Sequence, residues 1–262
     1  MINFVFSPAL IIFLFGICIG SFLNVCIYRI PENKSIVFPG SFCPNCKNDI
    51  PFYCNIPILS YIFLKGRCKF CRQPISIRYL LIETLTGIFA VVLYFKFGLI
   101  PAMIYWFVFI CVLITISFID FDHQIIPDII SLPGIVIFAS SFYFLPEMTI
   151  KDTLLGILAG GGSLYAVALC YYLVRKQEGM GGGDIKLLAM IGAATGIKGV
   201  FFTIFAGSLF GTFFGILIMV YTKIADKKNL KIPFGPFLSS GAILYIFFGQ
   251  QLIQWYLLSF EF

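Results

Sequence analysis

Long apolar runs alternate with short polar segments along almost the entire chain. A helix that crosses a bilayer needs about 20 predominantly apolar residues, whereas the strands of a membrane barrel show about 10 residues of alternating character. The runs here have helical length, although the sixth is shorter than the others. The sequence therefore predicts an all-α polytopic membrane protein with about eight transmembrane helices, at 8–28, 79–95, 101–119, 129–145, 153–174, 184–196, 199–221 and 234–258.

The composition supports this prediction and excludes an ordinary soluble domain. Hydrophobic residues make up 60% of the 262 residues and charged residues 11%, against about 25% charged residues in soluble domains. The first run is not typical of a signal peptide, because no basic segment precedes it, no small-residue cleavage site follows it, and its first cation is Arg29. We therefore expect a retained first transmembrane helix at 1–28, with its N-terminus outside.

The positive charge follows this predicted topology. With the N-terminus outside, all but three of the 18 Lys and Arg residues lie in cytoplasmic segments, the exceptions being Lys96, Lys151 and Lys198. Membrane proteins carry such an excess of cations in their cytoplasmic loops. The net charge of +6 thus indicates orientation in membrane lipid and not nucleic-acid binding. The same topology places the segment 29–78, the end of the third run and the start of the sixth at the cytoplasmic face.

The segment 29–78 is the one sizeable polar segment, and it contains two Cys-x-x-Cys pairs, Cys43 with Cys46 and Cys68 with Cys71. Two such pairs can supply four thiolates to a tetrahedral zinc ion. Two disulfides are the alternative interpretation, but disulfides rarely persist in a reducing cytoplasm. We therefore expect a small zinc-binding cytoplasmic domain at 29–78, followed by a membrane core at 79–262.

Two isolated carboxylates stand at the ends of predicted transmembrane helices. Asp120 follows the third run, and Asp184 follows a glycine-rich stretch that includes Gly181 and Gly183. A carboxylate beside hydrocarbon is costly and indicates a functional site. Two carboxyl groups that share one proton can hydrolyse a peptide bond, and the glycines leave room for an extended substrate backbone. Intramembrane carboxylates also carry ions and protons, so an ion-coupled transporter remains an open alternative.

The polar residues near these carboxylates give weaker indications. Helical spacing places His123 on the same face as Asp120, and Asp122 on nearly the opposite face. His123 is the only histidine in the chain, and one histidine without neighbouring ligands makes a poor metal site. Glu83 lies just inside the second run, where it either pairs with Arg78 or another interfacial cation or takes part in substrate binding.

Motifs across most of the chain resemble those of bacterial type IV prepilin peptidases, which are aspartic proteases of the Gly-x-Gly-Asp class. The matching stretches include the paired cysteines, Gly20-Ser21-Phe22-Leu23-Asn24-Val25, Tyr28-Arg29-Ile30-Pro31, Ile75-Ser76-Ile77-Arg78-Tyr79, Ile119-Asp120-Phe121-Asp122 and Gly179-Met180-Gly181-Gly182-Gly183-Asp184. The resemblance implies that Asp120 and Asp184 are catalytic. Tyr79-Leu80 departs from the family, in which Tyr-Pro is common, at the entry to the second run.

The same resemblance implies the substrates, the cofactors and the location. The family removes a short basic leader from prepilins and pseudopilins, after a glycine, at the cytoplasmic face of the bacterial inner membrane, for type IV pili and protein secretion. Relatives with the cysteine-bearing segment also methylate the new N-terminus with S-adenosylmethionine. This sequence has no Rossmann-type glycine motif, so the resemblance alone implies the methyltransferase. The region 79–262 is then the membrane peptidase core.

Overall fold

The computed structural model describes residues 2–177, 181–221 and 233–259. Within these residues the regular elements are helices, and extended backbone pairs only in two isolated bridges. The prediction of an all-α protein is therefore confirmed. The chain forms two compact units, Met1–Cys111 and Val112–Phe262.

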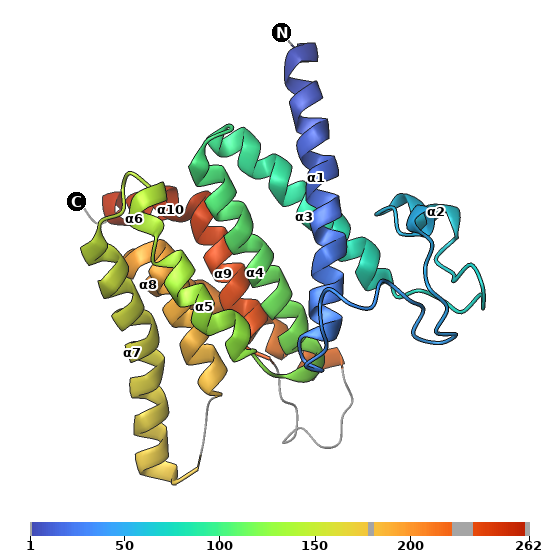
Figure 1. The fold of residues 1–262 in the computed structure, drawn as a ribbon. Helices are drawn as coiled ribbons and strands as arrows, with labels where there is room; N and C mark the ends of the chain where they lie inside the picture. Colours follow the sequence, from blue (N-terminus) through green and yellow to red (C-terminus); the bar gives the residue numbers. More distant parts are fainter. Residues whose placement is uncertain (1, 178–180, 222–232, 260–262) are drawn as a thin grey trace. The chain divides into compact units, whose positions relative to one another are not determined.

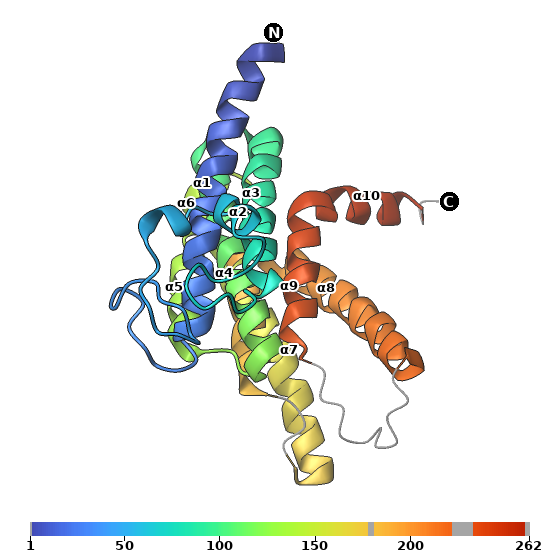
Figure 2. The same cartoon turned by 90° about the vertical axis from the view of Figure 1, so that its right-hand side faces the viewer.

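The first unit contains three long helical segments, α1 (Ile2–Arg29), α3 (Ile77–Phe97) and the beginning of α4 (Pro101–His123). α1 and α3 lie side by side (Figures 1 and 2). A Cβ added at Gly16 would stand 2.8 Å from the Cα of Gly87, and one added at Gly20 would stand 2.7 Å from the Cα of Glu83. The missing side chains of the two α1 glycines therefore allow the helices to pack backbone to backbone.

The segment between α1 and α3 contains two short helices, η1 (Phe52–Cys54) and α2 (Leu59–Phe63), together with tight turns at both cysteine pairs. Arg29, in the last turn of α1, attaches this segment to the helix. Its guanidinium donates to the carbonyl oxygens of Ser35 at 2.9 Å and Gly40 at 3.0 Å, and only 5% of the residue is exposed. A cation at this position also interacts favourably with the C-terminal end of the helix dipole.

The second unit begins within α4 and continues through α5 (Asp128–Phe138), α6 (Ser141–Phe144), α7 (Ile150–Arg175), α8 (Gly182–Tyr221), α9 (Gly235–Leu244), the π-helical segment η3 (Tyr245–Gly249) and α10 (Gln250–Leu258). A Cβ at Gly156 of α7 would stand 2.1 Å from the carbonyl oxygen of Gly192 of α8, so these two backbones touch. Ser141 donates to the carbonyl oxygen of Ala193 at 2.9 Å and connects α6 to the same region of α8. Figure 2 shows α10 turning away from the line of α9.

Six helices of the described part are long and apolar enough to cross a membrane, fewer than the eight that the sequence predicts. The predicted spans 184–196 and 199–221 both lie in α8, whose backbone leaves the helical conformation at Gly196. The predicted span 129–145 is divided between α5 and α6, and the 11 residues of α5 extend only about 17 Å at 1.5 Å per residue. The count by length is lower because α8 counts as one helix although it divides at Gly196, close to the predicted boundary, and because α5 and α6 are each too short to be counted.

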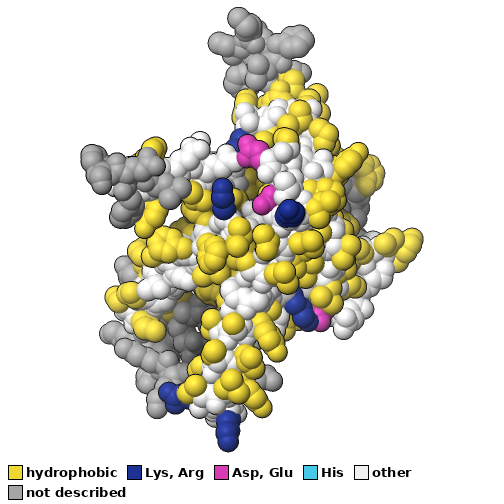
Figure 3. All heavy atoms as spheres, turned by 90° about the vertical axis from the view of Figure 1, so that its left-hand side faces the viewer, with side chains coloured by type: hydrophobic (Ala, Val, Ile, Leu, Met, Phe, Trp, Pro, Cys, Tyr) yellow, Lys and Arg dark blue, Asp and Glu magenta, His cyan; other side chains and the backbone are white. Residues whose placement is uncertain are grey.

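Large apolar side chains cover much of the helical surface. On α7, Leu158 is 69% exposed, Val167 58% and Val174 80%. Figure 3 shows a face of the molecule on which hydrophobic side chains predominate, with a few Lys, Arg, Asp and Glu residues between them. Water would make such a surface aggregate, whereas lipid hydrocarbon covers it favourably. The structure is that of a multi-pass membrane protein.

Candidate active site and metal centre

Asp120 lies at the C-terminal end of α4 and is only 6% exposed. Its Oδ2 atom accepts a hydrogen bond of 2.9 Å from the backbone N–H of Gly235, the first residue of α9. A Cβ at Gly235 would stand 2.6 Å from the same oxygen. A glycine at the start of α9 is therefore what allows a backbone N–H to reach the buried carboxylate.

Asp184 lies in the first turn of α8, where the helix dipole favours a negative charge. Its side chain is half-buried, and its backbone N–H donates to the carbonyl oxygen of Gly181 at 3.2 Å. The charges of Asp184 and Asp120 are close enough to repel each other. The second unit thus brings together the two aspartates that the sequence selects, although 64 positions separate them.

The two glycines selected beside Asp184 have different surroundings. A Cβ at Gly183 would stand 2.8 Å from the Cβ of Ile126, so glycine is needed there for α8 to approach the connection between α4 and α5. Gly181 is exposed, and a Cβ there would stand 3.9 Å from Oδ2 of Asp184, which is ordinary contact. The preceding motif residues Gly179 and Met180 lie outside the described residues.

The polar residues around the aspartates face outward. Asp122 and His123 are exposed, in contrast to the buried Asp120. Lys186 donates to the carboxylate of Asp128 at 2.6 Å and joins the first turns of α8 and α5. Sequence reasoning missed Gly235, although its position between Pro233 and Pro236 marks a break before the last apolar run.

The four cysteines predicted to bind zinc form one cluster in the first unit. Their sulfur atoms all lie within 4.8 Å of one another, and the Sγ atoms of Cys43 and Cys71 are 3.8 Å apart. Four sulfurs around a tetrahedral zinc ion, each at about 2.3 Å from the metal, lie about 3.8 Å from one another. The donor set and its spacing fit a tetrahedral zinc site.

The two Cys-x-x-Cys pairs have the same local structure. In each, the N–H of the first cysteine donates to the carbonyl oxygen five residues later, at 3.0 Å for Cys43 and 2.8 Å for Cys68. In each, the residue after the second cysteine has a positive φ, 59° at Lys47 and 60° at Arg72. Each turn is closed by an isolated bridge. It joins the residue before the first cysteine to the residue six positions after that cysteine. The ion would therefore join two equivalent turns.

The electrostatics of the cluster favour a bound cation. Hydrogen bonds from the backbone N–H groups of Cys71 and Phe70 stabilise the Cys68 thiolate and lower the pKa of that thiol to about 6. The Gln73 N–H acts in the same direction on Cys71, but burial and the three neighbouring thiols outweigh it and raise the pKa of Cys71 to about 11. Thiolates so close together repel one another, and metal binding removes this repulsion as it releases their protons.

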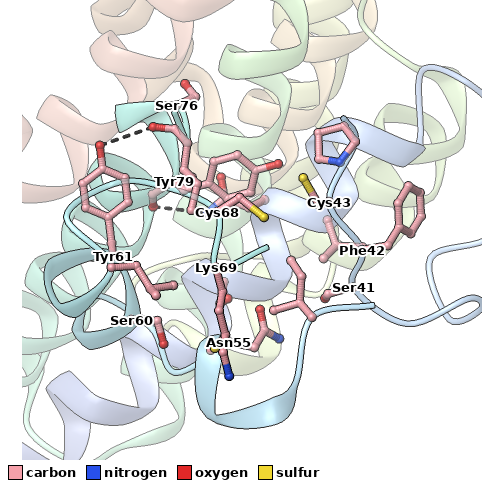
Figure 4. Close-up of a pocket in the computed structure, with 18 of the residues that line it drawn as sticks. Ser41, Phe42, Cys43, Asn55, Ser60, Tyr61, Cys68, Lys69, Ser76 and Tyr79 are labelled. Carbon is pink, nitrogen blue, oxygen red and sulfur yellow. Dashed lines mark hydrogen bonds between the residues drawn. The ribbon is translucent and has the colours of Figure 1, made fainter. Parts of the chain in front are cut away.

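Next to the cysteine cluster, the first unit contains a pocket of about 440 Å³. The C-terminal end of α1, the N-terminal end of α3 and the segment between them form its walls. Figure 4 shows Tyr79 beside Cys43 and Cys68 in this pocket, and Tyr61 and Lys69 on other parts of its wall. Its volume lies within the range of about 300–1,000 Å³ that is typical of small-molecule sites.

Two buried oxygen-bearing side chains line this pocket, Glu83 and Asn24. Glu83 Oε2 accepts a hydrogen bond of 2.7 Å from the N–H of Ile58, a β-branched residue held at φ 61° and ψ −53°. Such backbone strain costs about 1–3 kcal/mol and often occurs at functional sites. Asn24 Nδ2 donates to the carbonyl oxygens of Gly20 and Tyr79, while its Oδ1 has no hydrogen-bond partner among the described residues. Sequence reasoning left the role of Glu83 open.

Comparison with known proteins assigns both parts of the chain. Residues 14–97 match the model of the bacterial peptidase A24 N-terminal domain, and residues 107–216 match that of the type IV leader peptidase family. A prepilin leader peptidase/N-methyltransferase from Aeromonas salmonicida is 33% identical, with 94% of this chain and 93% of that protein covered. Proteins of the same name from Legionella pneumophila and Myxococcus xanthus are 31% and 36% identical, covering 98% and 86% of this chain and 97% and 68% of their own lengths. The chain belongs to the type IV leader peptidase family.

The candidate site residues of this leader peptidase family protein fall into two groups, one in each matched range. The four cysteines and the pocket lie in the N-terminal match, whereas Asp120 and Asp184 lie in the leader peptidase match. Gly235 lies beyond both matched ranges. No solved structure matches the chain. Nothing in these comparisons favours the ion-coupled transporter.

Proposed function

We propose that the protein is a membrane aspartic endopeptidase that removes the leader of type IV prepilins and pseudopilins, and that it then methylates the new N-terminus. One observation carries the peptidase: the buried carboxylate of Asp120, held by a backbone N–H, lies close enough to Asp184 for their charges to interact. Family membership supplies the reaction class, since the relatives are named prepilin leader peptidase/N-methyltransferase.

In the proposed mechanism Asp120 and Asp184 share one proton. Two carboxylates at close range do not both ionise easily, so the dyad holds one acid and one base. The ionised carboxylate takes a proton from a water molecule, which attacks the amide carbon, while the protonated carboxyl donates to the carbonyl oxygen. The tetrahedral species then collapses as a proton passes to the leaving nitrogen. The Gly235 N–H holds the Asp120 carboxylate in a fixed orientation throughout these steps.

The position of the dyad supports cleavage near the cytoplasmic membrane face. Asp120 ends α4 and Asp184 begins α8, so both lie at helix ends and not at the middle of a span. The distribution of Lys and Arg supports placing these ends at the cytoplasmic side of the inner membrane. Cleavage after a glycine of the substrate fits this arrangement, because a glycine adds no side chain to a crowded site. Exposed Gly181 beside Asp184 would leave space for the substrate backbone.

The N-terminal unit is the proposed location of methyl transfer. Zinc bound by Cys43, Cys46, Cys68 and Cys71 would hold the connecting segment against α1 and α3 and so maintain the pocket. When bound there, S-adenosylmethionine supplies an activated methyl group. The pocket fits such a group in one respect, because Asn24 Oδ1 is a buried acceptor without a partner in the described part of the chain.

The dyad is tested by Asp120→Asn and Asp184→Asn. Each variant should abolish cleavage of a prepilin in detergent while inserting normally, because an amide cannot exchange the shared proton. Asp122→Asn is the matched control, since its exposed side chain lies away from the dyad, and its effect should be mild. Mass spectrometry separates uncleaved, cleaved and methylated products. The assignment fails if either of the first two variants cleaves near the wild-type rate.

A further inference from the structure

The pocket of the first unit has an electrostatic character that the peptidase does not use. Glu83 is 7% exposed, and both of its hydrogen-bond donors, the Ile58 N–H and the Ser21 side chain, are uncharged. Asn24 is 2% exposed, and its Oδ1 accepts from no group in residues 2–177, 181–221 and 233–259. A buried acceptor without a partner is costly, so Asn24 Oδ1 favours a ligand that brings a donor, and Glu83 adds a carboxylate to the same pocket.

Three cations line the pocket, Arg29, Lys69 and Arg78, and none of them is among the groups that act on Glu83. Arg29 donates to the backbone carbonyls of Ser35 and Gly40. Lys69 donates to the hydroxyl of Tyr53 at 2.6 Å and lies over that ring. The negative character contributed by Glu83 is therefore available to a bound molecule.

The rest of the lining favours a cation with apolar parts. The aromatic residues on the wall are Tyr28, Phe42, Tyr61, Phe70 and Tyr79, and lysines of this chain already lie over the first two rings. Aromatic faces attract ammonium and sulfonium groups by their quadrupole while they bury the attached hydrocarbon. Figure 4 shows Tyr61 and Tyr79 on the pocket wall. A ligand of this pocket thus carries positive charge together with a flat or apolar part.

We propose that this pocket binds the cationic reactant of methyl transfer, with an ammonium group donating to Glu83 and to Asn24 Oδ1. The proposal rests on the methyltransferase part of the proposed function. The reaction offers two primary amines, the amino-acid part of S-adenosylmethionine and the new N-terminus of the cleaved pilin. Before the transfer the pilin ammonium loses one proton, to Glu83 if it occupies these acceptors and to water otherwise. The bond between the methyl carbon and the sulfonium sulfur then breaks as a bond to the neutral amine nitrogen forms, which gives a methylammonium terminus and S-adenosylhomocysteine.

Glu83→Gln tests the proposal, because it removes the charge and keeps an oxygen that can accept from the Ile58 N–H. Glu32→Gln is the matched control, since it removes an exposed carboxylate of the same unit that pairs with Lys34 outside the pocket. The purified full chain is measured in three assays: binding of radiolabelled S-adenosylmethionine, methylation of a previously cleaved pilin, and cleavage of a prepilin. Cleavage serves as the folding control, because both aspartates lie in the other unit.

If the methyl donor occupies the acceptors, Glu83→Gln weakens its binding by about 10- to 100-fold, the range for loss of a charge-assisted hydrogen bond. If the pilin amine occupies them, donor binding is unchanged and the KM for cleaved pilin rises by a similar factor. Unchanged donor binding together with an unchanged KM overturns the proposal. A wild-type chain that neither binds the donor nor methylates refutes the proposed methyltransferase itself, and the pocket proposal with it.

A second measurement does not depend on a variant. Hydrogen exchange of the wild-type segment 55–61, which contains Ile58, should slow when S-adenosylhomocysteine or cleaved pilin is added, because a ligand on Glu83 stabilises its contact with Ile58. Exchange that neither addition slows would contradict the proposal even if Glu83→Gln fails to fold.

Discussion

Replacing Gly235 with alanine should disable the proposed dyad while leaving the fold intact. The added Cβ would stand 2.6 Å from Oδ2 of Asp120, whereas ordinary contact begins at 3.4 Å, so the carboxylate must retreat by 0.8 Å. The obstacle is the end of a side chain, which can rotate away without moving either helix. The substitution should therefore displace the carboxylate without changing the packing of α4 and α9.

The size of the effect follows from the contact that is lost. The hydrogen bond from the Gly235 N–H to Asp120 has a length of 2.9 Å, and the retreat of the carboxylate would break it. A hydrogen bond to a charged group contributes about 1.5–3 kcal/mol, and each 1.4 kcal/mol of transition-state stabilisation changes a rate about tenfold. Gly235→Ala should therefore slow cleavage by about 10- to 100-fold.

The assay measures the initial rate of leader removal from a prepilin in detergent, with thermal unfolding recorded on the same sample. Gly162→Ala on α7 is the matched control, because a Cβ there has no atom within 4 Å. The control should cleave at the wild-type rate, and both variants should unfold at nearly the wild-type temperature. Cleavage by Gly235→Ala at the wild-type rate would refute the reasoning that its N–H positions Asp120.

Three further predictions concern the metal centre and helix packing. The purified chain should hold about one zinc ion, and elemental analysis without zinc would contradict this. Cys43→Ser should lose the ion and expose the connecting segment to proteases, because a cross-link that closes a loop of this length contributes about 3–4 kcal/mol. Gly156→Leu should lower the unfolding temperature strongly, since its Cβ would stand 2.1 Å from the backbone oxygen of Gly192, which cannot move alone; an unchanged melting curve would count against the close α7–α8 packing. Lys186→Ala should cost less than about 1 kcal/mol, because the ion pair with Asp128 is partly exposed; a large loss measured by denaturant unfolding would show that this pair is more than a surface contact.

The sequence predicted those features that depend on residue type and local spacing. Apolar runs of helical length predicted the all-α membrane fold, and the two Cys-x-x-Cys pairs predicted a four-thiol cluster, because two close pairs need only one loop closure to meet. Isolated carboxylates beside hydrocarbon drew attention to Asp120 and Asp184, since their cost requires an explanation.

The sequence did not predict contacts that depend on how helices cross. The hydrogen bond from Gly235 to Asp120 joins residues 115 positions apart. The sequence around one of these residues does not indicate a contact with the other. Likewise the sequence does not predict that the amide nitrogen of Asn24 donates to the backbone of Tyr79 while its oxygen has no partner among the described residues. The early end of α5 at Phe138 was likewise not predicted, because the apolar run 129–145 continues past the residue at which the helix ends.

The break at Gly196 divides α8 into two parts that can rotate relative to each other. Its first part carries Asp184 and touches α7 at Gly192, whereas its second part contacts α9, the helix that begins with the N–H bound to Asp120. The joint has φ 69° and ψ −175°, a conformation essentially restricted to glycine. Asp184 precedes it by 12 residues, or about 18 Å of helix, so a rotation of about 10° at the joint would displace the carboxylate by about 3 Å. A change of the Gly196 torsion would thus alter the separation of the two aspartates, and a side chain at this position should reduce cleavage.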